Sequence, residues 1–135
     1  MSYSIGKLAK SADMGIETIR FYERRGLMPE PPRAASGYRR YPPEATHRLR
    51  FIRRAKGLGF SLDEIGLLLS LQDGGDKAEV KAIAESKLAQ IEARIEDLKL
   101  MAGSLNDLIH RCSGRGSVAG CPIIEALSDP ESSDE

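Results

Sequence analysis

The sequence predicts a mainly α-helical protein, built from a helical head, one long helix and a short C-terminal loop. Three observations predict this class: apolar residues recur at helical spacing in the first 60 residues, an unbroken heptad pattern follows residue 76, and a glycine-rich segment with a cysteine at each end follows residue 111. We expect a head over residues 1–72, a long helix over 76–111, a loop with a short helix over 112–127, and a disordered acidic tail over 128–135.

The first two helices predict a DNA-binding motif. Apolar residues at Ile5, Leu8, Ala9 and Ala12 have the spacing of an amphipathic helix. A second, short helix follows Gly15, carries the run Thr-Ile-Arg-Phe-Tyr-Glu over residues 18–23, and stops at Gly26. Two helices joined by a glycine-containing turn, the second bearing Arg and Tyr, are typical of a helix-turn-helix.

The remainder of the head alternates between helix breakers and helices. Three prolines within residues 29–32 exclude a helix there, and residues 37–41 read as a short extended segment. A helix is expected over residues 44–56, and Gly57 and Gly59 end it. Ser61 and Glu64 then form a capping box, which predicts a further helix running to Leu71.

Charge separates the chain into two halves. The whole sequence has a net charge of zero, but residues 1–60 contain 13 Lys and Arg against 5 Asp and Glu, whereas residues 61–135 contain 7 against 15. A basic head beside an acidic body indicates that the head meets a polyanion, the alternative being that surface charge drifted into two blocks. The sequence has no apolar run of transmembrane length and no leader pattern, so we expect a cytoplasmic protein without membrane contact.

The long helix carries an apolar seam that needs a partner. Its members are spaced alternately by four and three residues, as in a coiled coil: Ala84, Leu88, Ile91, Ile95, Leu98, Ala102, Leu105 and Ile109. No other helix of the chain is long enough to cover this seam, which favours pairing with a second copy. The alternative is one long helix packed on its own head.

The two cysteines predict the chemistry of the C-terminal end. In a reducing compartment, Cys112 and Cys121 favour metal binding or redox chemistry over a structural disulfide. Paired thiolates select soft ions such as Cu(I), Ag(I), Au(I) and Hg(II), or the borderline Zn(II), Cd(II) and Pb(II). Two sulfurs alone suit a linear monovalent ion or Hg(II), since Zn(II) takes about four ligands. A reversible disulfide remains a rival, whereas no catalytic constellation appears, so we expect no enzyme.

Taken together, these motifs resemble the MerR family of transcriptional regulators. The resemblance rests on residues 18–23, Gly26-Leu27, the Gly-Tyr-Arg-Arg-Tyr run at 37–41, and residues 58–65, and it extends from Ile5 to Leu127. It implies a winged helix-turn-helix head and a long helix that pairs antiparallel with its twin. It also implies a homodimer on promoter DNA that distorts the promoter spacer, so that RNA polymerase can engage both promoter elements.

The resemblance places the second helix in the major groove and assigns contacts to it. Arg20 and Tyr22 would reach phosphates or base edges, Glu17 and Thr18 would read bases, and the wing residues Tyr38 and Arg39 would clamp the DNA backbone. Because a small head needs its few large apolar side chains inside, we expect a separate set of four in the core: Phe21, Leu27, Tyr41 and Phe60.

The end of the chain resembles the metal-responsive branch, which includes copper and mercury regulators. The run Cys-Pro-Ile-Ile at 121–124 matches that branch, so Cys112 and Cys121 are the expected metal ligands. At the start of the long helix the branch typically carries Ser in sensors of monovalent ions and Cys in sensors of divalent ions, and this chain has Lys77 there. An ammonium beside two thiolates would neutralise the site only with a monovalent ion, which favours Cu(I), then Ag(I) or Au(I).

The metal assignment has alternatives. A divalent ion, namely Hg(II), Zn(II), Cd(II) or Pb(II), is possible if Lys77 points into water. For such an ion His110 and Asp76 are candidate further ligands, whereas His47 lies among arginines and would approach phosphate instead.

Overall fold

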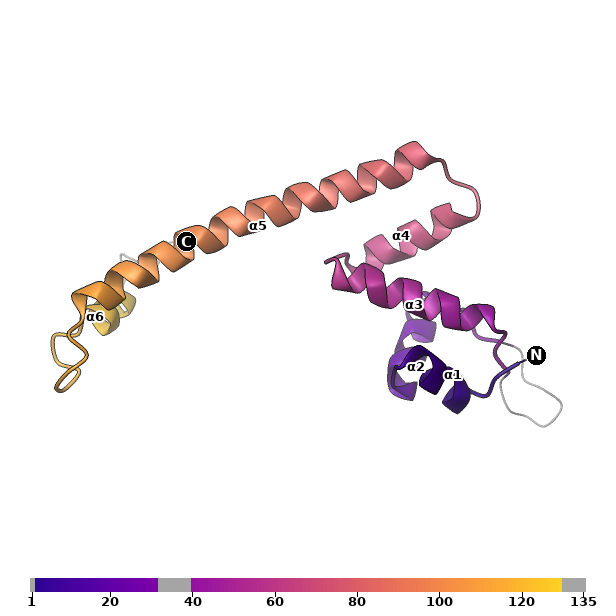
Figure 1. Cartoon of the computed structure of the whole chain (residues 1–135), viewed down its shortest axis with the longest axis horizontal. Coiled ribbons are helices and arrows are strands. Elements are labelled where there is room, and N and C mark those ends of the chain that lie inside the picture. The colour runs from indigo at the N-terminus through magenta and orange to yellow at the C-terminus, as the bar shows by residue number, and fades with distance from the viewer. Residues whose placement is uncertain (1, 32–39, 130–135) are drawn as a thin grey trace. The chain divides into compact units, whose positions relative to one another are not determined.

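The computed structural model describes residues 2–31 and 40–129, and over these residues it contains six α-helices and no strand beyond an isolated bridge (Figure 1). This confirms the mainly α-helical class. The chain divides within its longest helix into two units, residues 1–88 and residues 89–135. None of the described helices is long and apolar enough to cross a membrane.

Helices α1 (Ile5–Ala12) and α2 (Ile16–Arg24) form the predicted helix-turn-helix. The hydroxyl of Ser4 caps α1 by accepting a hydrogen bond from the backbone N–H of Lys7 at 3.2 Å. Asp13 ends α1 in the left-handed conformation, with φ of 55°, and this reverses the chain toward α2 within three residues. The bounds of both helices agree with the sequence prediction to within one residue.

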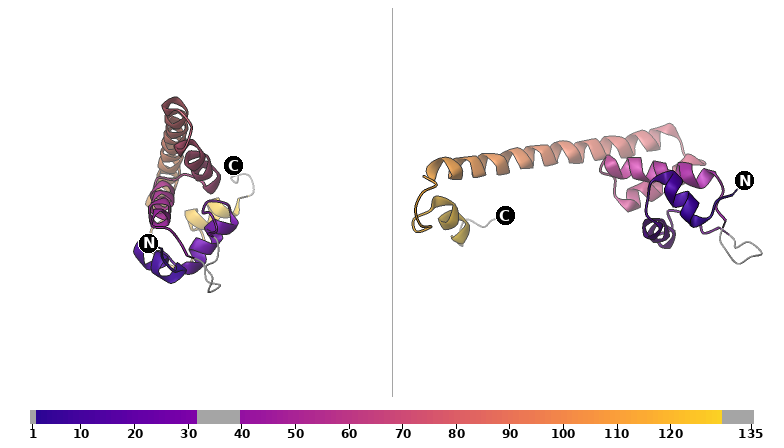
Figure 2. Two further views of the ribbon diagram at one scale, coloured as in Figure 1. Left: turned by 90° about the vertical axis from the view of Figure 1, so that its right-hand side faces the viewer. Right: turned by 60° about the horizontal axis from the view of Figure 1, so that its bottom comes forward.

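Helix α3 (Glu44–Gly57) organises the core of the head, because it packs against α1 on one side and against α4 (Leu62–Gln72) on the other (Figure 2). The side chains at the centre of this packing are at most 1% exposed, and they come from every part of the head: Leu8, Ile19, Tyr41, Leu49, Ile52 and Ile65.

Tyr41 joins the N-terminal segment to α2. Its backbone pairs with that of Tyr3 in an antiparallel bridge with two N–H···O bonds of 2.7 Å, and its hydroxyl donates to Oε2 of Glu23 at 2.5 Å. Arg40 and Tyr41 are the only residues of the predicted extended segment 37–41 that the structure describes. The predicted wing residues Tyr38 and Arg39 lie outside the described residues.

The aromatic residues of α2 correct the predicted core. Leu27 and Tyr41 are buried as expected and Phe60 is partly buried against the core, but Phe21 is 38% exposed and Tyr22 is only 5% exposed. The reason is helical phase: Tyr22 lies three residues after the buried Ile19 and so shares its face, whereas Phe21 points sideways from that face. The prediction that Phe21 belongs to the core was therefore wrong.

Two capping boxes begin helix α4 and the long helix that follows it. In the predicted one, Oγ of Ser61 accepts from Glu64 N–H at 3.1 Å and Oε1 of Glu64 accepts from Ser61 N–H at 2.7 Å. The second box was not predicted and starts α5 (Lys77–Arg111): Oδ1 of Asp76 accepts from Glu79 N–H at 3.0 Å, and Oε1 of Glu79 accepts from Asp76 N–H at 3.4 Å. These polar side chains set where α4 and α5 begin.

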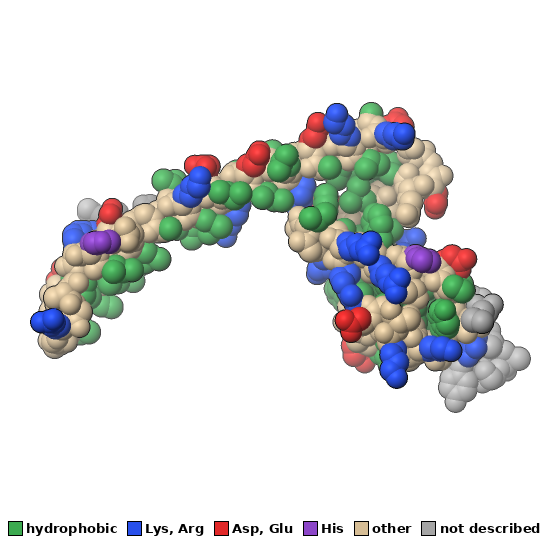
Figure 3. All heavy atoms as spheres, in the orientation of Figure 1, with side chains coloured by type: hydrophobic (Ala, Val, Ile, Leu, Met, Phe, Trp, Pro, Cys, Tyr) green, Lys and Arg blue, Asp and Glu red, His purple; other side chains and the backbone are tan. Residues whose placement is uncertain are grey.

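The unit of residues 89–135 contains most of α5, a loop and α6 (Pro122–Ser128). None of the 35 residues of α5 is buried. The large seam side chains from Leu88 to Ile109 are 40% to 58% exposed, and hydrophobic side chains line one side of α5 in Figure 3. In the described part of the chain, the seam is thus left uncovered.

Candidate DNA-binding face and metal site

Helix α2 presents a polar outer face beside a buried inner face. Glu17 and Arg20 are exposed and Thr18 is half-buried, which leaves all three on the side of α2 away from the core. Tyr22 belongs to the inner face with Ile19 and is 5% exposed, so only a small part of it reaches the surface of the head. The outward set on α2 is therefore Glu17, Thr18 and Arg20.

Further basic side chains lie on the surface of the head. Figure 3 shows Lys and Arg side chains gathered over the head. Arg25, just after α2, pairs with Asp63 at 3.3 Å and lies 5.9 Å from the centre of the Phe21 ring, which explains how an exposed phenyl group is partly covered. A face with several guanidinium groups suits contact with phosphates.

The arginines of α3 hold the helix-turn-helix together. Nε of Arg48 donates to the carbonyl of Leu27 at 2.6 Å, just beyond the end of α2. Arg53 donates to the carbonyls of Ala12 and Asp13 where α1 ends, and Arg50 reaches the carbonyl of Ser11 at 3.4 Å. The last carbonyls of a helix lack partners within the helix, and a cation there also interacts favourably with the helix dipole. The sequence showed that α3 is basic but did not show this bracing role.

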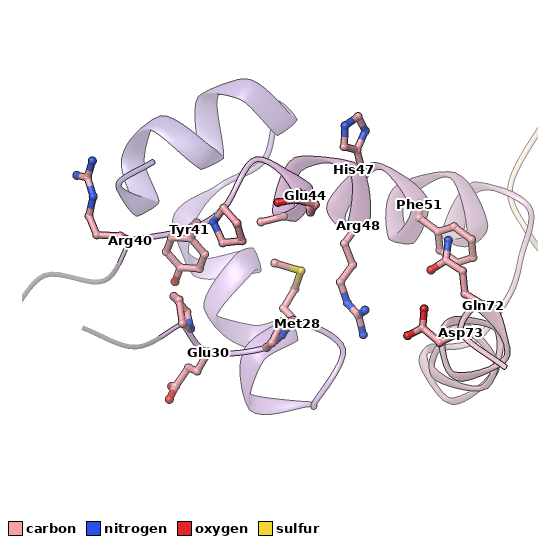
Figure 4. A pocket seen from close by; sticks show the side chains of 14 residues that line it. Met28, Glu30, Arg40, Tyr41, Glu44, His47, Arg48, Phe51, Gln72 and Asp73 are labelled. Atoms are coloured by element: carbon pink, nitrogen blue, oxygen red, sulfur yellow. The ribbon is translucent and has the colours of Figure 1, made fainter. Parts of the chain in front are cut away.

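A cavity of about 650 Å³ opens between the segment after α2, the start of α3 and the end of α4. Its apolar lining includes Met28, Tyr41 and Phe51, and Figure 4 shows Arg48 and Asp73 pointing toward one another across it. Charges of both signs line this space. It therefore lacks the single positive sign expected of a surface that follows a DNA backbone.

The two cysteines come together at the end of α5. Their Sγ atoms are 3.9 Å apart, both thiols are free, and both side chains are half-buried. The chain returns on itself between them through three glycines in the left-handed region, Gly114, Gly116 and Gly120, with φ of 75°, 87° and 78°. Glycine adopts this conformation at no steric cost, so the composition of the loop permits the two sulfurs to meet.

The environment of Cys121 favours its thiolate. Cys121 is the N-cap of α6, where the backbone N–H groups of Ile124 and Ile123 lower the pKa of its thiol. A hydrogen bond with Cys112 acts in the same direction, whereas partial burial and the charge of Glu125 oppose it. Since the thiolate is the form of cysteine that binds metals, this arrangement prepares the pair for a soft cation.

The candidate third ligands do not gather at this pair. Among the described residues, no three His, Cys, Asp or Glu side chains cluster so as to hold a metal ion. Nδ1 of His110 donates to the carbonyl of Asn106 at 2.9 Å, and the carboxylate of Asp76 caps α5. Lys77 is exposed as the first residue of α5 and belongs to the unit of residues 1–88. Among the residues that the structure describes, the candidate site therefore consists of two thiols.

Comparisons with known proteins show the family of this chain. A family model described as "MerR HTH family regulatory protein" matches residues 3–72, and one described as "MerR, DNA binding" matches residues 46–108. The chain is 43% identical over 124 residues to the mercuric resistance operon regulatory protein of Serratia marcescens, and the match covers 92% of this chain and 86% of that protein.

Two solved structures are similar over almost the full length. A transcription regulator from Ralstonia metallidurans in complex with lead(II) has a TM-score of 0.83 at 38% identity, with 93% of this chain and 99% of that chain covered. The dual-function regulator MerR from Bacillus megaterium in complex with mercury(II) has a TM-score of 0.71 at 38% identity, with 94% and 100% covered.

Proposed function

We propose that this chain, which belongs to the MerR family of helix-turn-helix regulatory proteins, binds promoter DNA as a homodimer and alters transcription when a soft metal ion binds its paired cysteines. The observation that carries the proposal is the thiol pair, 3.9 Å apart, directly after a helix that starts in a DNA-binding head. The effector site and the DNA-binding face then belong to one continuous stretch of chain.

For the head, we propose that α2 enters the major groove. Arg20 provides a forked donor for phosphate or guanine, and Glu17 and Thr18 reach base edges. Tyr38 and Arg39 of the wing are proposed to contact the DNA backbone. Tyr22 is 5% exposed, and we propose that it contacts a phosphate through its hydroxyl alone.

For the dimer, we propose that the seam of α5 pairs antiparallel with the seam of a second copy. A stripe of large apolar side chains that are 40% to 58% exposed would be unfavourable in water. Pairing two copies covers both stripes along their length, which is the usual way in which a heptad pattern is buried.

For the effector, we propose Hg(II), held by Cys112 and Cys121. Two thiolates without a third ligand gathered among the described residues suit a soft ion that accepts two sulfurs, and two similar proteins are named for mercury. When bound, the ion cross-links the two sulfurs and neutralises their charge. Pb(II), Zn(II) and Cd(II) take more ligands, which a second subunit would have to supply.

Cu(I), with Ag(I) or Au(I), is the second candidate, and Lys77 favours it. Two thiolates and a monovalent ion leave one negative charge, which a nearby ammonium from the partner subunit would balance. Lys77→Cys should then move the response toward divalent ions, whereas an unchanged ion preference would remove this candidate.

The test is transcription in vitro from the promoter that this protein binds, with each ion buffered to a known free concentration. We expect Hg(II) to change the output of the wild type, and we expect the double variant Cys112→Ser, Cys121→Ser to lose that response while it keeps its affinity for DNA. Ser113→Ala, in the same loop, is the matched control and should respond normally.

The redox rival is tested in the same assay. Peroxide or diamide without metal should leave transcription at its basal level. A response to oxidant that exceeds the response to every ion would contradict the metal proposal and favour the disulfide switch.

A further inference from the structure

Lys87 is an unusual lysine, because it lies on α5 and yet is largely withdrawn from water. Its side chain is 13% exposed, its Nζ is 3.0 Å from Oε1 of Glu64, and it lies 5.8 Å from the centre of the Phe60 ring. Lysine is rarely buried to this extent unless it is paired. Lys99, on the same helix, shows the ordinary arrangement: it pairs with Glu96 at 3.4 Å and stays 69% exposed.

The partner of Lys87 already has a structural task. The same Oε1 of Glu64 accepts the backbone N–H of Ser61 in the capping box that begins α4. The hydrogen bond from Ser61 and the ammonium of Lys87 both lower the pKa of Glu64, so the carboxylate is held in its charged form. A movement of Lys87 would therefore alter the charge balance at the start of α4.

We propose that Lys87 is a positioning residue that couples α5 to the DNA-binding head through Glu64. A displacement of α5 on effector binding would then change the positions of α4 and of the turn that joins α3 to α4. This inference rests on the proposed function. The helix α5 is continuous from Lys77 to Arg111 and Cys112 follows it directly in the chain, so the helix that carries Lys87 leads into the thiol pair.

The head offers a route from that contact to α2. Glu64 and Phe60 flank the turn after α3, and α3 is the helix whose Arg53 and Arg48 hold the end of α1 and the end of α2. The ion pair between Lys87 and Glu64 is either formed or broken. These are two discrete states of the protein, and an effector can favour one of them over the other.

The test uses the full-length protein on its operator and compares two variants with a control. Lys87→Met removes the positive charge of the ion pair. Glu64→Gln removes the negative charge, while glutamine still serves the capping box. Lys99→Met is the matched control on the same helix. The measurements are transcription with and without buffered Hg(II) at saturating occupancy, operator affinity, ion affinity and thermal unfolding.

We expect Lys87→Met and Glu64→Gln each to reduce the ratio of transcription with ion to transcription without ion by about threefold to tenfold. The affinities of the thiols for the ion and of the head for DNA without ion should change little, which a loss of stability alone would not produce. The double variant should be no worse than either single variant, Lys87→Arg should restore most of the ratio, and Lys99→Met should match the wild type.

Equal ratios in the wild type and in Lys87→Met would overturn the inference, as would additive losses in the double variant. If Lys87→Met is too unstable to assay, Glu64→Gln tests the same ion pair, and an unchanged ratio in that variant would overturn the inference as well. A wild-type protein that responds to no ion would overturn the proposed function, and the role of Lys87 with it. A wild-type protein that responds while Lys87→Met responds equally well would overturn only the role of Lys87.

Discussion

The head and the unit that follows it solve the burial of apolar surface in different ways. The described residues of the head gather 14 buried apolar side chains into one core, whereas α5 and α6 bury none. The head thus obtains its hydrophobic stabilisation from within the chain, while the second unit presents its apolar seam outward. The difference teaches that the head covers its own apolar surface, whereas the second unit needs a partner for its seam, as in the proposed dimer.

The two units also use charged and nucleophilic groups differently. In the head, guanidinium groups of α3 satisfy backbone carbonyls, and a hydroxyl from Tyr41 satisfies Glu23. In the second unit, the two thiols lie beside each other, and the thiol of Cys121 also lies at the backbone N–H groups that begin α6. The guanidinium and hydroxyl groups of the head stabilise its fold, whereas the thiols of the second unit are available to a ligand.

The largest effect is expected from a charge in the seam. Leu98→Asp would place a carboxylate from each copy in a covered apolar seam, at a cost of about 5 kcal/mol or more and a loss of roughly 1,000-fold or more in dimer affinity. Sedimentation equilibrium measures it. Ala93→Asp, at a position outside the seam, should remain dimeric, and a dimeric Leu98→Asp protein would contradict pairing through the seam.

The next effect is expected from a cavity in the head. Ile52 is 0% exposed, and Ile52→Ala should lower the free energy of unfolding by about 3 kcal/mol. Leu67→Ala, at a side chain that is 49% exposed, should change it by less than about 0.5 kcal/mol. Urea denaturation followed by circular dichroism measures both, and equal losses would show that the two positions do not differ as described.

A smaller effect is expected from the arginine that closes the turn of the helix-turn-helix. Arg53→Met leaves the carbonyls of Ala12 and Asp13 without this donor, and it should cost about 1 to 2 kcal/mol and weaken operator binding through the misplaced α2. Arg54→Met, one residue along the helix, serves as the stability control. Unfolding curves together with an operator titration separate the two quantities, and unaltered stability of Arg53→Met would refute the bracing role.

The smallest effect concerns the acidity of Cys121. Because the backbone N–H groups of α6 lower its pKa, the thiolate absorbance of a Cys112→Ser variant should appear at lower pH than that of an ordinary cysteine. The folded state gains stability from this thiolate above the pKa of the unfolded thiol, and that gain is lost as the pH falls through the folded pKa. Glu125→Gln removes a charge that raises the pKa, so it should move the titration to still lower pH, and a shift upward would contradict the assignment.

Much of this architecture could be predicted because it is encoded locally. The apolar spacing of residues 5–12, the Ser61–Glu64 capping box and the heptads of α5 each concern residues within a turn or two of one another. The pair of cysteines was also predicted, since a short loop with three left-handed glycines leaves its ends close together.

Contacts between distant segments could not be predicted in this way. Helical phase puts Tyr22 on the same face as Ile19, but only the packing of α2 against α1 and the rest of the core shows that this face is the inner one. The same holds for Arg53 at the carbonyls of α1 and for Lys87 at Glu64, because nothing near either residue in the sequence marks its partner.

The sequence by itself determined the helices, the seam and the thiol pair, since backbone hydrogen bonding and apolar periodicity depend on neighbours along the chain. Only the tertiary structure decided which arginines brace the head, which aromatic ring is buried, and where α5 is tied to α4. These contacts depend on which surfaces pack together and exclude water. That packing is determined by side chains that are distant from one another in the sequence.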